Sequence, residues 1–115
     1  MKTFNQIKKP EEKLLVAIFG QLPVGKKANL YRREVNGVTL KEAVKVALST
    51  LPPREAAIIR MRFRFYDPFG RGWTLKDIGE IFGVTSERIR QLEAKGLRRL
   101  RHPRNSRLLS SYFLR

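Results

Sequence analysis

The sequence contains no cysteine and a single histidine, His102, among its 115 residues. The lack of cysteine excludes disulfides, thiolate metal sites and a cysteine nucleophile. One histidine is too few for a histidine-rich metal site or a conventional catalytic relay. The sequence therefore predicts a protein that is not an enzyme and that uses no metal and no cofactor.

Long apolar runs and acidic residues are also scarce. No run approaches the roughly 20 apolar residues of a membrane-spanning helix, and no signal-peptide arrangement precedes the first predicted helix. Only 10 Asp and Glu stand against 25 Lys and Arg, which gives a net charge of +15 at pH 7. This balance favours a polyanionic partner. We expect a cytoplasmic, nucleoid-associated protein that binds nucleic acid and no membrane.

Glycines and prolines divide the chain into two parts of different character. Residues 1–38 are predicted to form an N-terminal extension with one short helix, which starts at Pro10 and ends at Gly20. In its simplest interpretation this amphipathic helix covers the domain. The segment around Asn36 and Gly37 is either extended about a turn or irregular. Residues 39–115 are predicted to form the main domain.

Successive helix signals follow from Thr39 onward. Thr39 can cap a first helix, and Pro53 suits the first position of a second. Thr74 and Asp77 have the spacing of a capping box, and Thr85 can cap the next helix. A terminal helix can follow the break at Pro103. The predicted fold class is all-α: a small helical domain with a C-terminal helix-turn-helix and no wing.

The helix-turn-helix is predicted from two short helices joined through Gly83. Gly79, four residues earlier, would let the second helix approach the first closely. Apolar residues occupy the positions that would line their shared core: Ile78, Phe82, Val84, Ile89 and Leu92. A simple helical hairpin has the same pattern and remains the alternative at this point.

The second helix presents Glu87, Gln91 and Arg98 opposite its apolar stripe, with Arg90 and Lys95 flanking them. Arginine can pair with guanine, glutamine with adenine, and glutamate can accept a hydrogen bond from cytosine. The later basic residues are uniformly cationic: Arg98, Arg99, Arg101, Arg104 and Arg107. We interpret the first half of this face as base-reading and the second half as phosphate-holding.

The stretches "LPPREAAIIRMRF" and "TLKDIGEIFGVTSERIRQLEAKGLRRLRHPRNSRLLSSYFL" resemble region 4 of sigma-70 family sigma factors, most closely that of primary sigma factors. The resemblance covers about residues 39–115 and does not extend to region 2. It implies a domain that binds the promoter −35 element and docks on the flap tip of the RNA polymerase β subunit. The protein itself is expected to be monomeric.

The resemblance also assigns roles to individual residues. Glu87, Arg90 and Gln91 align with base-facing positions, and the residues aligned near DNA backbone or bases are Arg54, Arg62, Thr74 and Lys95. The apolar residues that could serve either docking or the core are Ile58, Ile59, Phe63 and Phe65. His102 lies in the family's "RHP" sequence and is expected to be a structural residue at a helix end.

Three features depart from the resemblance. Ser86 stands where primary sigma factors usually carry an arginine that contacts a −35 guanine, so weaker binding and an altered hexamer preference are expected. Gly96 stands in place of a small helix-forming residue. Glycine within a helix lowers its stability by about 1 kcal/mol relative to alanine. The connection 64–73 is longer and richer in aromatic residues than is common.

Several functions are compatible with these features. The first is a transcription regulator that binds −35-type DNA and polymerase together. The second is a phage or mobile-element protein that occupies the flap tip and displaces the host's region 4, and a third is the C-terminal fragment of a full sigma factor. A nonspecific nucleic-acid binder or a LuxR-like repressor accounts less well for the "RHPRNSR" ending. The segment "PEEKLLVAIFG" is also similar to a short part of the polymerase β subunit near the flap base, by coincidence, mimicry or fusion.

Overall fold

The computed structural model describes residues 9–23, 30–63, 65 and 73–113. The part of the chain that it describes contains α2 (Pro10–Phe19), β1 (Glu34–Val35), β2 (Val38–Thr39), α3 (Leu40–Ser49), α4 (Pro53–Arg62), α5 (Leu75–Phe82), α6 (Ser86–Arg101), α7 (Pro103–Ser110) and the 3-10 helix η2 (Ser111–Phe113). The predicted all-α class is confirmed, with one small hairpin added to it.

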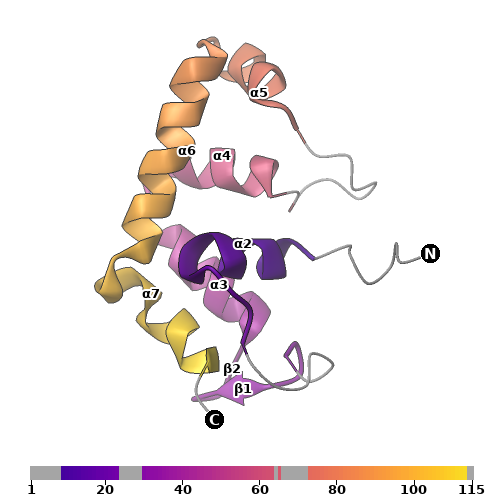
Figure 1. Ribbon diagram of the computed structural model, residues 1–115, viewed down its shortest axis with the longest axis vertical. Coiled ribbons are helices and arrows are strands. Elements are labelled where there is room, and N and C mark those ends of the chain that lie inside the picture. The colour runs from indigo at the N-terminus through magenta and orange to yellow at the C-terminus, as the bar shows by residue number, and fades with distance from the viewer. Residues whose placement is uncertain (1–8, 24–29, 64, 66–72, 114–115) are drawn as a thin grey trace, which may run out of the picture.

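The helices form a flat molecule of 43 × 40 × 21 Å. The 16-residue α6 runs along one side and continues into α7 (Figure 1). α5 lies against the first part of α6 and α4 against its middle, while α2 and α3 lie near its last part (Figure 1). One long helix therefore connects the two ends of the molecule.

Local signals set the helix boundaries as predicted. The side chains of Thr39, Thr74 and Thr85 each accept a hydrogen bond from the amide three residues later. Caps of this kind contribute about 1 kcal/mol each, because they satisfy amides that have no partner within the helix. Gly20 and Gly83 end their helices in the left-handed region, with φ of 81° and 71°.

A short antiparallel hairpin precedes α3. Glu34 pairs with Thr39 and Val35 with Val38, around a turn in which Asn36 and Gly37 have φ of 55° and 76°. Two consecutive positive φ values are typical of the tight turn that asparagine followed by glycine favours. Of the two interpretations of this segment, the extended one is therefore confirmed.

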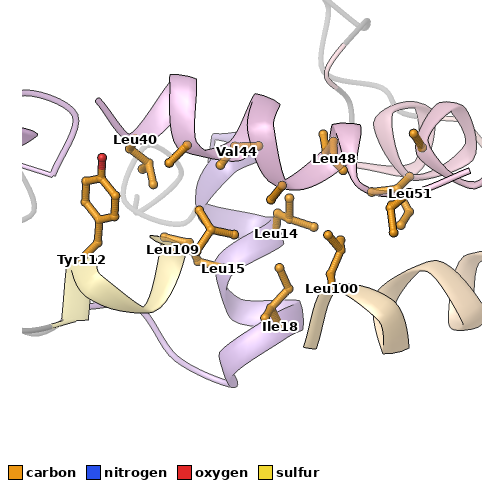
Figure 2. Packing of buried hydrophobic residues seen from close by; sticks show 14 of the residues in the cluster. Leu14, Leu15, Ile18, Leu40, Val44, Leu48, Leu51, Leu100, Leu109 and Tyr112 are labelled. Atoms are coloured by element: carbon orange, nitrogen blue, oxygen red, sulfur yellow. The ribbon is translucent and has the colours of Figure 1, made fainter. Parts of the chain in front are cut away.

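The apolar residues form two separate clusters. The larger contains buried residues from α2, α3, α6 and α7, including Leu14, Leu48, Leu100 and Leu109 (Figure 2). The smaller consists of Ile58, Ile78, Ile89 and Leu92, from α4, α5 and α6. α4 also contributes Ala56 and Ile59 to the larger cluster, so α4 and α6 together hold the helix-turn-helix end and the α2 end in one fold.

Two glycines allow close contacts between helices. A Cβ at Gly79 would lie 2.6 Å from the carbonyl oxygen of Val84, which confirms the close approach predicted there. A Cβ at Gly96 would lie 2.7 Å from Cδ1 of the buried Ile59. The expectation that Gly96 only weakens α6 is therefore incomplete, because its missing side chain also makes room for α4.

Candidate nucleic-acid interface

α5, the turn at Gly83 and α6 form the predicted helix-turn-helix. Ile78 and Ile89 are fully buried between the two helices, and Leu92 is 5% exposed. Phe82 and Val84 pack against the same cluster. With its apolar stripe held in this way, α6 has the opposite face available to solvent.

The predicted base-reading residues all lie on that exposed face of α6. Ser86 is its first residue, and Glu87, Arg90 and Gln91 follow within about the first turn and a half. Lys95 and Arg98 continue this face further along the helix. A hollow on this surface is lined by Arg88, Arg90, Gln91, Ala94, Lys95 and Arg98.

Glu87 and Arg90 on this face are paired with each other. Arg90 donates from Nε and Nη2 to the two carboxylate oxygens of Glu87, at 2.9 and 2.6 Å. This pairing lowers the pKa of Glu87 and raises that of Arg90, through the hydrogen bond first and the opposite charge second. Both side chains are more than half exposed, so the pair is weak enough to exchange for a DNA contact.

Arg88 is an exposed member of this face that the sequence interpretation omitted. Its Nη1 donates to the side-chain oxygen of Gln91 at 3.4 Å. The omission arises because the helical position of Arg88 is at the edge of the outer face, where spacing alone does not separate a flanking residue from a contacting one.

The residues outside α6 that are predicted to lie near DNA differ in whether their side chains already make contacts within the protein. Arg62 is partly exposed and is tethered by two contacts within the domain: its Nε lies 3.3 Å from Glu93 Oε2, and its Nη1 donates to the Trp73 carbonyl at 3.0 Å. Thr74 caps α5 with its hydroxyl oxygen. Arg54 is exposed at the start of α4, with its guanidinium 5.7 Å from the centre of the Phe82 ring.

The distal arginines do not form one uniform phosphate-binding row. Arg99 pairs with the buried Glu55 at 3.0 Å, and Arg101 donates to the carbonyl of Ala17 in α2. Arg98 and Arg104 line a hollow that also includes His102. The interpretation of this group as equivalent phosphate holders is therefore too simple, because two members have partners within the protein.

His102 has the helix-end role expected of it. Its Nδ1 accepts the amide N–H of Arg104 at 3.1 Å, and Pro103 is the first residue of α7. Proline suits this position because its missing N–H would have no partner there.

The four apolar candidates for docking separate into two pairs. Ile58 and Ile59 have no exposed surface and belong to the core, which was the alternative role considered for them. Phe63 and Phe65 are partly buried against the larger cluster. Phe65 also lines an apolar-floored hollow of about 430 Å³ with Val44 and Leu48. Residue 64 and residues 66–72 of the aromatic connection lie outside the described residues.

Among the helices of the described ranges, none is both long enough and apolar enough to cross a membrane.

Comparison with known proteins finds one family and several relatives. Residues 47–102 match the family described as sigma-70, region 4. The RNA polymerase sigma factor SigA of Microcystis aeruginosa is 49% identical over 79 residues, which cover 69% of this chain and 18% of the relative. The SigA of Clostridium acetobutylicum is 52% identical over 73 residues, which cover 64% of this chain and 19% of the relative.

This chain thus spans less than a fifth of the length of these relatives. The matched stretch begins within α3 and ends just after α6, so it includes the helix-turn-helix and the helix that supports it. The resemblance predicted from the sequence is confirmed. The chain belongs to the sigma-70, region 4 family of DNA-binding helix-turn-helix domains in transcription initiation.

Proposed function

We propose that this protein is a transcription regulator that binds −35-type promoter DNA through α6 and docks on the flap tip of the RNA polymerase β subunit. One observation carries the DNA half of the proposal. Glu87, Arg90 and Gln91 are all exposed on one face of α6, while Ile89 and Leu92 hold the helix against its neighbours. Hydrogen-bonding groups held in this way are suited to the major groove.

The polymerase half is supported by family membership and by the position of Phe63 and Phe65. Both aromatic residues are partly exposed just after α4. The hollow beside Phe65 has an apolar floor, and its charged lining consists of Lys41, Lys45 and Arg60 together with the carboxylates of Glu11 and Glu42. Such a surface suits a partner helix that presents mainly apolar side chains.

The DNA half is tested by fluorescence anisotropy with a −35 duplex and a scrambled duplex of equal length at the same salt concentration. We expect tighter binding to the −35 duplex. Matched salt is essential, because a protein of charge +15 binds any DNA more tightly as salt falls. Equal affinities for the two duplexes would refute specific recognition.

The polymerase half is tested by adding the purified chain to core polymerase and to polymerase that lacks the flap tip. Retention on the first and loss on the second is the expected result. Equal retention on both would refute docking at the flap tip and leave the DNA result unaffected.

Ser86 provides a gain-of-function prediction. It is the exposed first residue of α6, where the resemblance implies an arginine that contacts guanine. Ser86→Arg should tighten binding to the −35 duplex by about 1–3 kcal/mol, with a smaller gain on a duplex whose guanine is replaced. Ser86→Lys is the control for added charge, and an equal gain from both variants on all duplexes would show that position 86 contacts no base.

The same serine favours a second candidate function. If the DNA contact is weak, the protein could act mainly by occupying the flap tip and displacing another region 4. Transcription from −35-dependent and extended −10 promoters distinguishes the two functions. A displacing inhibitor lowers output from the first class selectively, whereas an activator raises it.

A further inference from the structure

Glu93 is an acidic residue on α6, the helix that is proposed to bind DNA. It lies two residues after Gln91, in a protein of net charge +15. A carboxylate near phosphate groups weakens DNA binding through charge repulsion. The Glu93 side chain is only 17% exposed, so it does not belong to a freely solvated surface. The contacts of this carboxylate therefore matter for DNA binding.

Glu93 contacts the guanidinium of Arg62, the last residue of α4. Nε of Arg62 donates to Oε2 of Glu93 at 3.3 Å, and Nη1 donates to the Trp73 carbonyl at 3.0 Å. A guanidinium is planar, so anchors at two of its nitrogens fix its orientation as well as its position. These contacts use two of its five N–H donors, and the Arg62 side chain is 32% exposed. The guanidinium thus has further donors, and exposed surface through which an external acceptor can reach it.

The anchored guanidinium lies at the start of the helix-turn-helix. Trp73 immediately precedes Thr74, the N-cap of α5. In helix-turn-helix domains the first helix crosses the DNA backbone. An arginine at this point is suited to a phosphate group, because its N–H donors and its charge both match phosphate oxygens. A DNA phosphate is therefore the external acceptor that fits this position.

The helices that carry the ion pair are held in fixed relative positions. A Cβ at Gly96 of α6 would lie 2.7 Å from Cδ1 of Ile59 of α4, so the two helices are in close contact there. Glu93 precedes Gly96 by three residues and Arg62 follows Ile59 by three, which places the ion pair about one turn from this contact on each helix. With the backbones fixed in this way, only side-chain torsions separate a held guanidinium from a free one.

We propose that Glu93 is a positioning residue, which holds the Arg62 guanidinium in the orientation that binds a DNA phosphate. The inference rests on the proposed function, because α6 and α5 must approach DNA. It does not require a sequence preference, since a phosphate contact is the same on every sequence. Failure of −35 specificity would leave it standing, and its own failure would leave −35 specificity standing.

The proposal predicts an effect opposite to that of charge alone. Removal of a carboxylate from a DNA-binding surface tightens binding, because repulsion is lost. Removal of the carboxylate that holds Arg62 should weaken binding, because the guanidinium must then be ordered when DNA binds. The sign of the change in affinity distinguishes the two roles.

The test compares Glu93→Ala and Glu93→Gln, two variants with the same charge. Glutamine keeps a side-chain oxygen that can accept from Nε of Arg62, whereas alanine keeps none. By fluorescence anisotropy, Glu93→Ala should bind both the −35 and the scrambled duplex about fivefold to tenfold more weakly than wild type, and Glu93→Gln should stay within about twofold of wild type. Glu80→Ala, exposed on α5, is the control for loss of a carboxylate and should bind no more weakly than wild type.

A double-mutant cycle tests whether Glu93 acts through Arg62. Arg62→Ala should reduce the slope of log affinity against log salt by about one. In the Arg62→Ala background, Glu93→Ala should cause no further loss of affinity. Urea unfolding of each variant ensures that folded proteins are compared. A merely structural ion pair would lower stability and leave the affinity of the folded protein unchanged.

The Nε–H resonance of Arg62 provides a measurement on the unmodified chain, and it decides the matter if Glu93→Ala fails to fold. This proton should exchange slowly with water in the free protein and stay protected when DNA is bound. Loss of the protection on DNA binding would show that Arg62 leaves Glu93 to reach the phosphate, and would overturn the proposal.

Two affinity results would also overturn it. One is tighter binding by Glu93→Ala, to the same extent as by Glu80→Ala, which would make Glu93 a repulsive charge only. The other is an undiminished loss from Glu93→Ala in the Arg62→Ala background, which would mean that Glu93 does not act through Arg62.

Discussion

Arg90 and Arg98 both lie on the outer face of α6, but their surroundings differ. Arg90 forms a two-point contact with Glu87, one turn from the start of the helix. Arg98 lines both hollows along the helix, which places its charge further from the first turn. The setting of Arg90 suits a side chain that is oriented for base contact. The setting of Arg98 suits a side chain that supplies charge to the phosphate backbone.

The two arginines should therefore respond differently to truncation. Arg90→Ala should weaken binding to the −35 duplex by about 1–3 kcal/mol and relax the preference at one base position. Arg98→Ala should weaken binding to all duplexes alike and reduce the slope of log affinity against log salt by about one. Anisotropy with a panel of single-base variants, over a range of salt, separates the two effects. If Arg90→Ala weakens all duplexes equally, Arg90 is a phosphate contact.

We expect the Asp77 carboxylate to make the stability of the protein depend on pH. The amide and hydroxyl of Thr74 hold the pKa of Asp77 below its ordinary value of 3.8. A lowered folded-state pKa means that the contribution to stability is present above the unfolded pKa and is lost as pH falls through the folded pKa. Asp77→Asn should therefore lower stability at pH 7 and reduce the loss of stability below about pH 4. Urea unfolding at several pH values measures both effects, and Glu80→Gln, on the same helix, is the control. An unchanged acid limb in Asp77→Asn would show that the cap contributes nothing.

At the scale of elements, the helix boundaries could be predicted because their signals are local. Caps at Thr39, Thr74 and Thr85 depend on residues three positions apart. The partners of Arg99 and Arg101 are 44 and 84 positions away, and no local pattern reveals them. For this reason the outer face of α6 was predicted, whereas the division of the distal arginines was not.

The α5–α6 junction leads to a prediction about stability. Gly79→Ala would place Cβ 2.6 Å from the Val84 carbonyl oxygen, a backbone atom that cannot move without shifting the turn. We expect a loss of about 1–3 kcal/mol in the free energy of unfolding, despite the better helix propensity of alanine. Chemical denaturation measures it, with Glu80→Ala, exposed on the same helix, as control. A stabilised Gly79→Ala variant would mean that the two helices pack less closely than described.

At the scale of the whole molecule, charge and core are connected through α6. The helix carries the exposed face at one end and contributes Leu100 to the larger cluster at the other. Composition predicted a basic protein of +15, but it could not show which cations act within the fold. The position of α2 was also beyond local reasoning, because the same amphipathic helix could cover the domain loosely or form part of its core.

Arg99 is the clearest case of a cation that acts within the fold. Its partner Glu55 is 6% exposed at the side chain, whereas Arg99 itself is 46% exposed. Arg99→Ala would leave this buried carboxylate without its ion-pair partner, and we expect a loss of about 1–2 kcal/mol in stability after allowance for solvent screening. Its charge is already neutralised, so the salt dependence of DNA binding should change less than it does in Arg98→Ala. If this division is correct, denaturation will show a larger loss of stability for Arg99→Ala than for Arg98→Ala. Anisotropy will show the reverse order for the loss of salt dependence. The opposite result would be a drop of about one in the salt slope for Arg99→Ala with stability unchanged. It would mean that Arg99 contacts the DNA backbone and that its ion pair with Glu55 does not stabilise the fold.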